Sequence, residues 1–199
     1  MAHIRNIQEY KDLAVKDCML RDEIQATLDL IQKEHSISPY MRTFRDYYKF
    51  KGDFATEDIL SMENKFGLKR GHTTKASDKY DGWIHFKWHH AKEPQDILFK
   101  KLKELIDLHD ENAEKIMDVR SKCDSHSVNI IGKSFSVSLP LNENWGFMIR
   151  ECLGDAFDEL STEDIIAIEK ETNAILTHRD TYGYHFRWKL PIKHIKYNE

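Results

Sequence analysis

The sequence has little of what marks a secreted, membrane-spanning or disordered chain. Its three cysteines, Cys18, Cys123 and Cys152, are odd in number and widely spaced, which argues against a disulfide framework and for reduced, buried thiols. Four prolines and eight glycines are too few for a disordered chain. No apolar run approaches the roughly 20 residues of a membrane span, and the first residues lack the apolar core of a secretory signal. We therefore expect a soluble, cytoplasmic protein that does not bind membranes.

An excess of positive charge is also lacking. The 199 residues contain 30 Lys and Arg against 34 Asp and Glu, which gives a formal net charge of −4 with the 11 His taken as neutral. This balance gives no global attraction to nucleic acid or to an anionic membrane, so any phosphate-binding surface must be local. Aromatic residues make up 11% of the chain, and they can form a core because each one buries a large apolar area.

The spacing of apolar residues predicts a helix-rich α+β chain. Apolar residues recur at helical spacing in the long segments and at alternate positions in the short ones. Capping residues and prolines set most of the boundaries. Helices are predicted over 7–34, 56–66, 94–120, 144–160 and 162–176, strands over 83–89 and 184–190, a strand or hairpin over 127–141, and loops over 67–81 and 178–183.

Two sequence patterns occur twice, in the same order. TEDILSME at 56–63 is matched by TEDIIAIE at 162–169, and IHFKWH at 84–89 is matched by YHFRWK at 184–189. Two ordered matches are much rarer by chance than one. The period of about 100 residues is far above that of solenoid repeats, so we predict an internal duplication into two helix-helix-helix-strand halves with a small antiparallel sheet in one compact, pseudo-twofold domain. The predicted halves are 1–92 and 93–199.

The repeated strand predicts one aromatic face and one polar face, because side chains alternate across a strand. Phe and Trp on the aromatic face suit a core. If the two polar faces converge on a common cleft, their cations suit phosphate oxygens, and their imidazoles exchange protons near neutral pH. The candidate ligand-binding residues are Trp83, Lys87, His89, Arg187 and Lys189, and the candidate catalytic acid/base pair is His85 and His185.

Three functions agree with this pattern. The first is a binding module for a phosphate-bearing small molecule or nucleic acid. The second is a metal-independent enzyme that processes a phosphodiester with His85 and His185 as general acid and base. The third is a protein-interaction or inhibitor protein that turns its acidic helices toward a basic partner. A purely structural alternative is that the cations are solvated or protect a sheet edge. The natural ligand, catalysis and the oligomeric state stay open.

The twin strands are similar to those of the two-histidine phosphoesterases, which are pseudo-symmetric proteins whose paired strands carry His-x-Thr or His-x-Ser. In this chain the third position of the motif is Lys87 in one strand and Arg187 in the other. The one literal His-x-Thr runs from His72 to Thr74 in a predicted loop, and no equivalent follows His178. The two repeated strands therefore lack the Thr or Ser that defines the motif.

No metal or cofactor site is predicted from the spacing. His85 and His89 share a strand face but lie about 13 Å apart by strand rise, which is too far for one metal ion. His109 falls on the apolar stripe of its predicted helix, so we interpret it as structural. The tripeptide GKS at 132–134 resembles the end of a phosphate-binding loop, but position 127 is serine instead of glycine and strands are expected on both sides.

Overall fold

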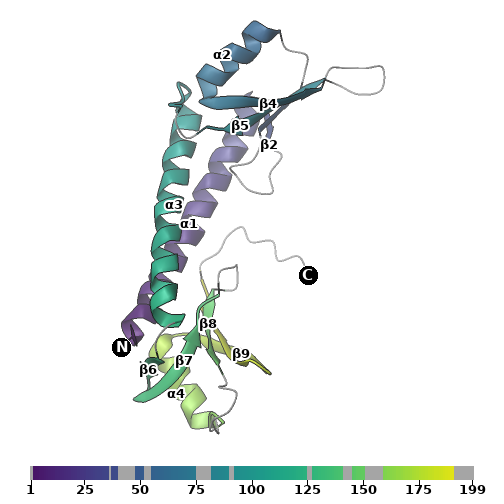
Figure 1. Ribbon diagram of the computed structural model, residues 1–199. Helices are drawn as coiled ribbons and strands as arrows, with labels where there is room; N and C mark the ends of the chain where they lie inside the picture. The colour runs from purple at the N-terminus through teal and green to yellow at the C-terminus, as the bar shows by residue number, and fades with distance from the viewer. Residues whose placement is uncertain are drawn as a thin grey trace. The chain divides into compact units, whose positions relative to one another are not determined.

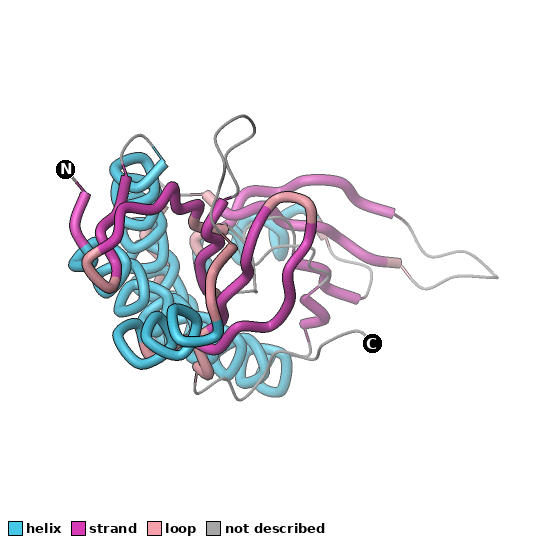
Figure 2. Tube along the Cα trace, turned by 90° about the horizontal axis from the view of Figure 1, so that it is seen from below, coloured by secondary structure: helices cyan, strands magenta, loops and turns pink. Residues whose placement is uncertain are grey.

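The computed structural model describes most of the chain as two compact units (Figure 1). Unit 1 consists of Met1–Met19 and His109–Glu199, and unit 2 consists of Leu20–Leu108. Helices (cyan in Figure 2) and antiparallel strand pairs (magenta) occur in both units, which confirms the α+β class. The described residues are 2–35, 37–39, 48–51, 55–74, 82–89, 92–124, 127–140, 145–150 and 159–190.

Two long helices contribute to both units. Helix α1 spans Ile4–His35 and helix α3 spans Ile97–Asp124, which confirms the helices predicted over 7–34 and 94–120. Within unit 1 the two helices share a buried polar contact, in which His109 Nε2 lies 3.1 Å from Asp17 Oδ1. His109 is only 8% exposed, as expected for a structural histidine. Cys18 and Cys123 are buried, and Cys152 lies outside the described residues.

Unit 2 contains a four-stranded antiparallel sheet in the order β2-β3-β5-β4. The predicted aromatic face of β5 is buried, because Ile84 and Phe86 are both 0% exposed and share a core with Phe66 and Phe99. The Phe66 and Phe99 rings lie 4.7 Å apart between centroids. The elements of this unit, besides parts of α1 and α3, are β2 (Ile37–Pro39), β3 (Tyr48–Lys51), α2 (Thr56–Phe66), β4 (Leu68–Thr74) and β5 (Trp83–Trp88).

Helix α2 ends at a glycine because the chain reverses sharply there. Gly67 has a left-handed φ of 64°, and a Cβ atom at this position would lie 2.8 Å from Cγ of Pro94. Glycine meets both demands, since it adopts positive φ freely and has no side chain. The helix predicted over 56–66 is confirmed.

Unit 1 contains a six-stranded sheet in the order β1-β6-β7-β8-β10-β9, in which β1 pairs parallel to β6 and the other pairs are antiparallel. Its strands pack with helix α4 around one hydrophobic core. In Figure 1 the labels β7, β8, β9 and α4 mark this region. The elements are β1 (Ala2–His3), β6 (Ser127–Ile130), β7 (Lys133–Ser138), β8 (Gly146–Arg150), α4 (Thr162–Thr172), β9 (Ile175–Asp180) and β10 (Gly183–Arg187).

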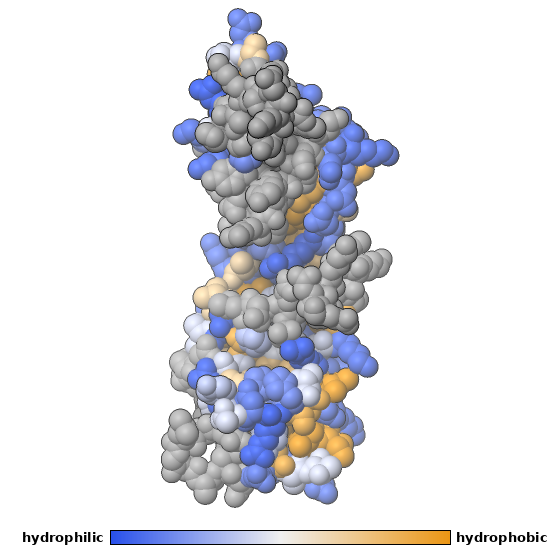
Figure 3. Space-filling view, turned by 90° about the vertical axis from the view of Figure 1, so that its right-hand side faces the viewer, coloured by the Kyte–Doolittle hydropathy of each residue, from blue (hydrophilic) through white to orange (hydrophobic). Residues whose placement is uncertain are grey.

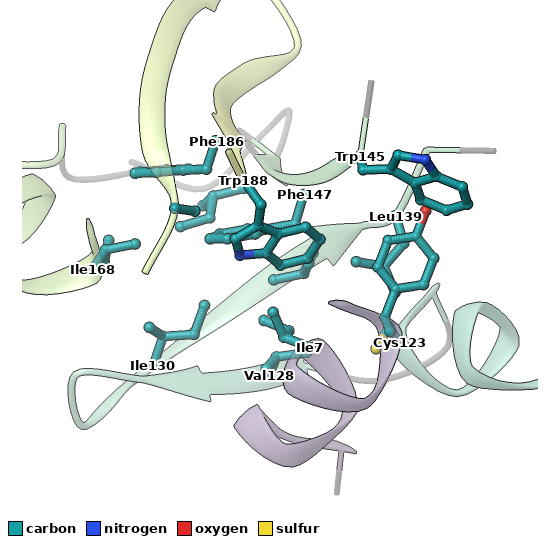
Figure 4. Packing of buried hydrophobic residues seen from close by; sticks show 14 of the residues in the cluster. Ile7, Cys123, Val128, Ile130, Leu139, Trp145, Phe147, Ile168, Phe186 and Trp188 are labelled. Atoms are coloured by element: carbon teal, nitrogen blue, oxygen red, sulfur yellow. The ribbon is translucent and has the colours of Figure 1, made fainter. Parts of the chain in front are cut away.

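The aromatic face of β10 forms the centre of this core (Figure 4). The rings of Phe147 and Phe186 stack at 5.0 Å with an interplanar angle of 8°. The Trp188 ring packs 5.9 Å from Phe147, and its Nε1 donates a hydrogen bond of 3.1 Å to the carbonyl oxygen of Thr172 at the end of α4. The hairpin predicted over 127–141 is also confirmed, as strands β6 and β7.

The helix predicted over 144–160 is wrong where the structure describes it. Residues 146–150 form strand β8, and 151–158 lie outside the described residues. Phe147 and Ile149 are buried while Arg150 is exposed, so the segment alternates at period two between β7 and β10. The sequence Gly-Phe-Met-Ile-Arg is too short to separate this alternation from helical spacing.

Both predicted polar loops are also wrong in part. Residues 68–74 form strand β4, and residues 178–180 belong to strand β9, while 75–81 lie outside the described residues. Strand β9 begins at Ile175, so the helix predicted over 162–176 is wrong at its end, since α4 ends at Thr172. Each of the two strands lies at the edge of its sheet and pairs with one of the repeated strands, β5 or β10. Edge strands are half solvated, so their sequences are polar and resemble loops.

The two units contain the same strand order. Strands β2-β3-β5-β4 of unit 2 correspond to β7-β8-β10-β9 within unit 1, and α2 and α4 each precede the edge strand. His85 is opposite Lys49 in unit 2, and His185 is opposite Met148 in unit 1. The halves predicted at 1–92 and 93–199, and the duplication itself, stay a prediction.

None of the described helices has an apolar stretch long enough to cross a membrane. On the face drawn in Figure 3, most of the coloured residues are hydrophilic (blue), and smaller groups of hydrophobic residues (orange) lie among them.

Candidate functional site

Two of the predicted site residues of the first repeated strand, His85 and Lys87, lie on the face of β5 opposite the core. Lys87 is exposed and His85 is half-buried. His89 follows the strand and is half-buried, with a buried Nδ1 atom. The backbone of Trp83 begins β5, and its side chain lies outside the described part of the structure.

Strand pairing brings three lysines to register positions beside these residues. Lys69 of β4 is directly opposite Lys87, and both side chains are exposed. Strand β3 pairs with the other edge of β5, where Lys49 is the register partner of His85 and Lys51 is that of Trp83. We call Lys69, His85 and Lys87 the basic face of unit 2, and Lys49 is the register partner of His85 beside it.

Like charges directly opposite one another destabilise a strand pair. The remaining register positions on this side of the sheet, Ser38 and Thr74, are also not acidic. The arrangement therefore concentrates positive charge in a chain whose net charge is negative.

The predicted residues of the second repeated strand have different neighbours. Arg187 of β10 is half-buried, opposite Gly146 on β8 and Ile175 on β9, and Lys189 after the strand is exposed. His185 is half-buried and lies next to an acidic residue, since its Nε2 is 3.0 Å from Asp180 Oδ2. The polar side of β10 is therefore less basic than that of β5.

A second histidine completes a cluster on the β9–β10 hairpin. The rings of His178 and His185 are stacked, with centroids 4.2 Å apart and an interplanar angle of 11°. One ligand atom from each of His178, Asp180 and His185 lies within 4.8 Å of the other two. We call these three residues the hairpin cluster.

Asp180 is held in a fixed orientation by the turn that follows it. Its Oδ1 accepts hydrogen bonds from the backbone N–H groups of Tyr182, at 2.8 Å, and Gly183, at 3.1 Å. The Tyr182 N–H, the His185 imidazole and the Gly183 N–H hold the pKa of the Asp180 carboxyl below its usual range. Asp180 is therefore an anion at neutral pH.

The predicted joint site of His85 and His185 combines residues from the two units. His85 belongs to unit 2 and His185 to unit 1. The convergence of the two polar faces on a common cleft stays a prediction.

Sequence reasoning missed Lys69, His178 and Asp180, because all three fall in segments that it interpreted as loops. A signal was present in the shared order of the repeats. TEDILSME and TEDIIAIE are each followed, at the same distance, by a histidine, His72 or His178. This equivalence, combined with the repeated strand, would have predicted a hairpin in both places.

Comparison with known proteins found no family model, no curated protein and no solved structure that matches this chain.

Proposed function

We propose that this chain is a binding module for a phosphate-bearing ligand, and that the basic face of unit 2 is its binding surface. The observation that carries the proposal is the direct pairing of Lys69 with Lys87, beside the His85–Lys49 pair. Both lysine side chains are exposed on the same side of the sheet, so one anion can contact both. Ammonium groups are common phosphate ligands.

A nucleic acid strand is the extended form of this ligand. The lysine positions lie on three neighbouring strands, β3, β5 and β4, which are spaced about 4.8 Å apart. Positively charged surfaces of proteins track the backbone of a single nucleic acid strand in this way. Arg187 at the equivalent position of β10 supplies one cation on the corresponding side of unit 1.

We also propose that the chain arose by internal duplication. Two observations support the duplication. The strand orders match, and a similar hydrogen bond between a helix and an edge strand occurs inside each unit. Glu63 of α2 accepts a hydrogen bond from the backbone N–H of Arg70, and Glu169 of α4 accepts one from that of Leu176. The two glutamates are the final residues of the repeated octapeptides. Each one connects its helix to the following edge strand by a hydrogen bond.

Binding to a fluorescently labelled single-stranded oligonucleotide tests the proposed function. The double variant Lys69→Gln/Lys87→Gln removes two candidate phosphate contacts without adding negative charge. Each phosphate contact to a single strand contributes about 0.7 to the slope of log affinity against log salt, so the slope should fall by about 1.4. Fluorescence anisotropy titrations over a range of salt concentrations measure this change.

The matched control is Lys100→Gln/Lys101→Gln, which removes the same charge from exposed positions on α3 in the same unit. We expect the control to retain the wild-type slope. Equal slopes for wild type and Lys69→Gln/Lys87→Gln would overturn the proposal. Competition by pyrophosphate or a nucleotide distinguishes a small phosphate ligand, which displaces the oligonucleotide at low concentration, from an extended strand, which is displaced only by another strand.

A further inference from the structure

We propose that the hairpin cluster of unit 1, formed by His178, Asp180 and His185, is a binding site for a divalent transition-metal ion such as Zn²⁺. Two imidazoles and one carboxylate are a ligand set that Zn²⁺ and related ions accept. The ligand atoms already lie within 4.8 Å of one another, although the three residues come from two strands.

The separation of Asp180 and His185 fits a shared ion. Ligand–metal distances near 2.1 Å place neighbouring ligand atoms about 3.0 to 3.4 Å apart in octahedral or tetrahedral geometry. His185 Nε2 and Asp180 Oδ2 are 3.0 Å apart, so these two atoms need little movement. An ion takes the place of the proton between His185 Nε2 and Asp180 Oδ2, and this proton moves through solvent to Nδ1 of the same ring, so that His185 binds as a neutral imidazole.

Thr177 selects the tautomer of His178 that a metal requires. The Thr177 hydroxyl donates its single proton to the carbonyl oxygen of His185 at 3.0 Å. The same Thr177 oxygen lies 3.1 Å from His178 Nδ1 and has no second proton to donate, so it can only accept a hydrogen bond there. The donor is therefore Nδ1, which carries the ring proton. The neutral ring therefore has its lone pair on Nε2, which is the nitrogen that would bind the ion.

Asp180 is also positioned by its surroundings. The backbone amides of Tyr182 and Gly183 occupy Oδ1, which leaves Oδ2 directed at His185. Metal-binding carboxylates and histidines usually have such outer hydrogen bonds, because these bonds fix the direction of the ligand. All three outer contacts of this cluster, from Thr177, Tyr182 and Gly183, come from the hairpin itself.

The position of the cluster leaves room for further ligands. Strand β9 is the last strand of its sheet, and His178 and Asp180 are exposed. Three protein ligands with an open side are typical of sites in which water or substrate completes the coordination, while structural zinc sites are closed by four protein ligands. We therefore infer a site that exchanges its remaining ligands with solvent.

Unit 2 lacks the carboxylate at the equivalent position. Under the correspondence of strands, His72 and His85 match His178 and His185, but Thr74 stands where unit 1 has Asp180. A threonine is a poor ligand for a transition ion. Among the residues that the structure describes, we therefore infer one ion, at unit 1.

Calorimetric titration of the metal-free protein with Zn²⁺ tests the site. We expect one saturable ion per chain, and a loss of affinity of about 10- to 100-fold in each of His178→Gln, Asp180→Asn and His185→Gln. The matched control His89→Gln alters a half-buried histidine outside the cluster and should bind as wild type does. Thermal unfolding without metal verifies that each variant is folded.

Thr177 gives a second, independent test of the same site. Thr177→Val keeps the shape of the side chain but removes the hydroxyl, so Zn²⁺ affinity should fall by about tenfold, whereas Thr177→Ser should restore it. With Co²⁺ as the probe, the visible absorption band of the bound ion should weaken in His178→Gln and in His185→Gln. Wild-type Zn²⁺ affinity in both histidine variants, or no saturable binding to the wild-type protein, would overturn the inference.

Discussion

At the scale of single residues, the burial of Tyr10 makes its contribution to stability depend on pH. Tyr10 is fully buried in unit 1, where its hydroxyl donates a hydrogen bond to the carbonyl oxygen of Pro140. Its ring packs 5.7 Å from Trp145 and 6.0 Å from Trp188. Burial raises the pKa of the phenol above its usual range, and the nearby Arg120 opposes this shift only in part.

The raised pKa predicts a loss of stability at alkaline pH. The folded chain holds the Tyr10 proton more tightly than the unfolded chain, so its contribution is complete below pH ~10 and is lost as the pH rises further. Tyr10→Phe should cost about 1 kcal/mol at about pH 8, because the Pro140 carbonyl loses its donor. Between about pH 8 and about pH 11, however, the variant should lose less stability than wild type.

Urea unfolding at both pH values, followed by circular dichroism, measures these differences in the free energy of unfolding. A variant that loses as much stability as wild type over this pH range would show that the Tyr10 phenol is not responsible.

At the scale of elements, a glutamate fastens each short helix to the edge strand that follows it. In unit 1, Glu169 Oε1 accepts a hydrogen bond of 2.8 Å from the backbone N–H of Leu176 in β9. This amide lies close to the point where the register between β9 and β10 shifts. Because such irregular positions disrupt the regular hydrogen-bond ladder, the carboxylate supplies a partner that the neighbouring strand does not.

Removal of this contact should loosen β9 more than the rest of unit 1. Glu169→Ala leaves the Leu176 amide without its charged partner, at an expected cost of about 1.5–3 kcal/mol. Glu169→Gln retains an oxygen acceptor and should cost about half as much. Hydrogen exchange of the β9 amides should accelerate in the alanine variant, and a similar cost for both variants in urea unfolding would contradict the role of charge.

At the scale of the whole molecule, the buried side chains form two separate hydrophobic cores. One core belongs to unit 1 and contains Phe147 and Phe186, and the other belongs to unit 2 and contains Phe86 and Phe99. The long helices α1 and α3 contribute residues to both cores. Regions with their own core often open independently, and hydrogen exchange detects such openings.

A mild substitution in each core tests this independence. Phe99→Leu and Phe147→Leu should each reduce stability by about 1–2 kcal/mol, which is less than the 3–5 kcal/mol expected of alanine. Phe99→Leu should accelerate hydrogen exchange mainly in β4 and β5, and Phe147→Leu mainly in β8 and β10. Equal acceleration in both sheets for either variant would indicate a single cooperative core.

Part of the candidate site could be predicted from the sequence, and part could not. The repeated hexapeptide predicted the strands that carry His85, Lys87, His185 and Arg187, since aromatic residues at period two require a buried face. The neighbours of these residues were not predictable. Lys69 reaches Lys87 through pairing between strands 18 positions apart, and local sequence does not encode such register.

The sequence by itself determined the helices and the buried faces. Helices α1, α2, α3 and α4 follow from local spacing and caps, because each backbone hydrogen bond joins residues four apart. The tertiary structure alone decided that polar segments become the edge strands β4 and β9, that β8 is a strand, and that a carboxylate and two imidazoles meet on one hairpin. The physical reason is that strands obtain their hydrogen bonds from other segments, so a polar sequence pairs wherever a neighbour offers an open edge.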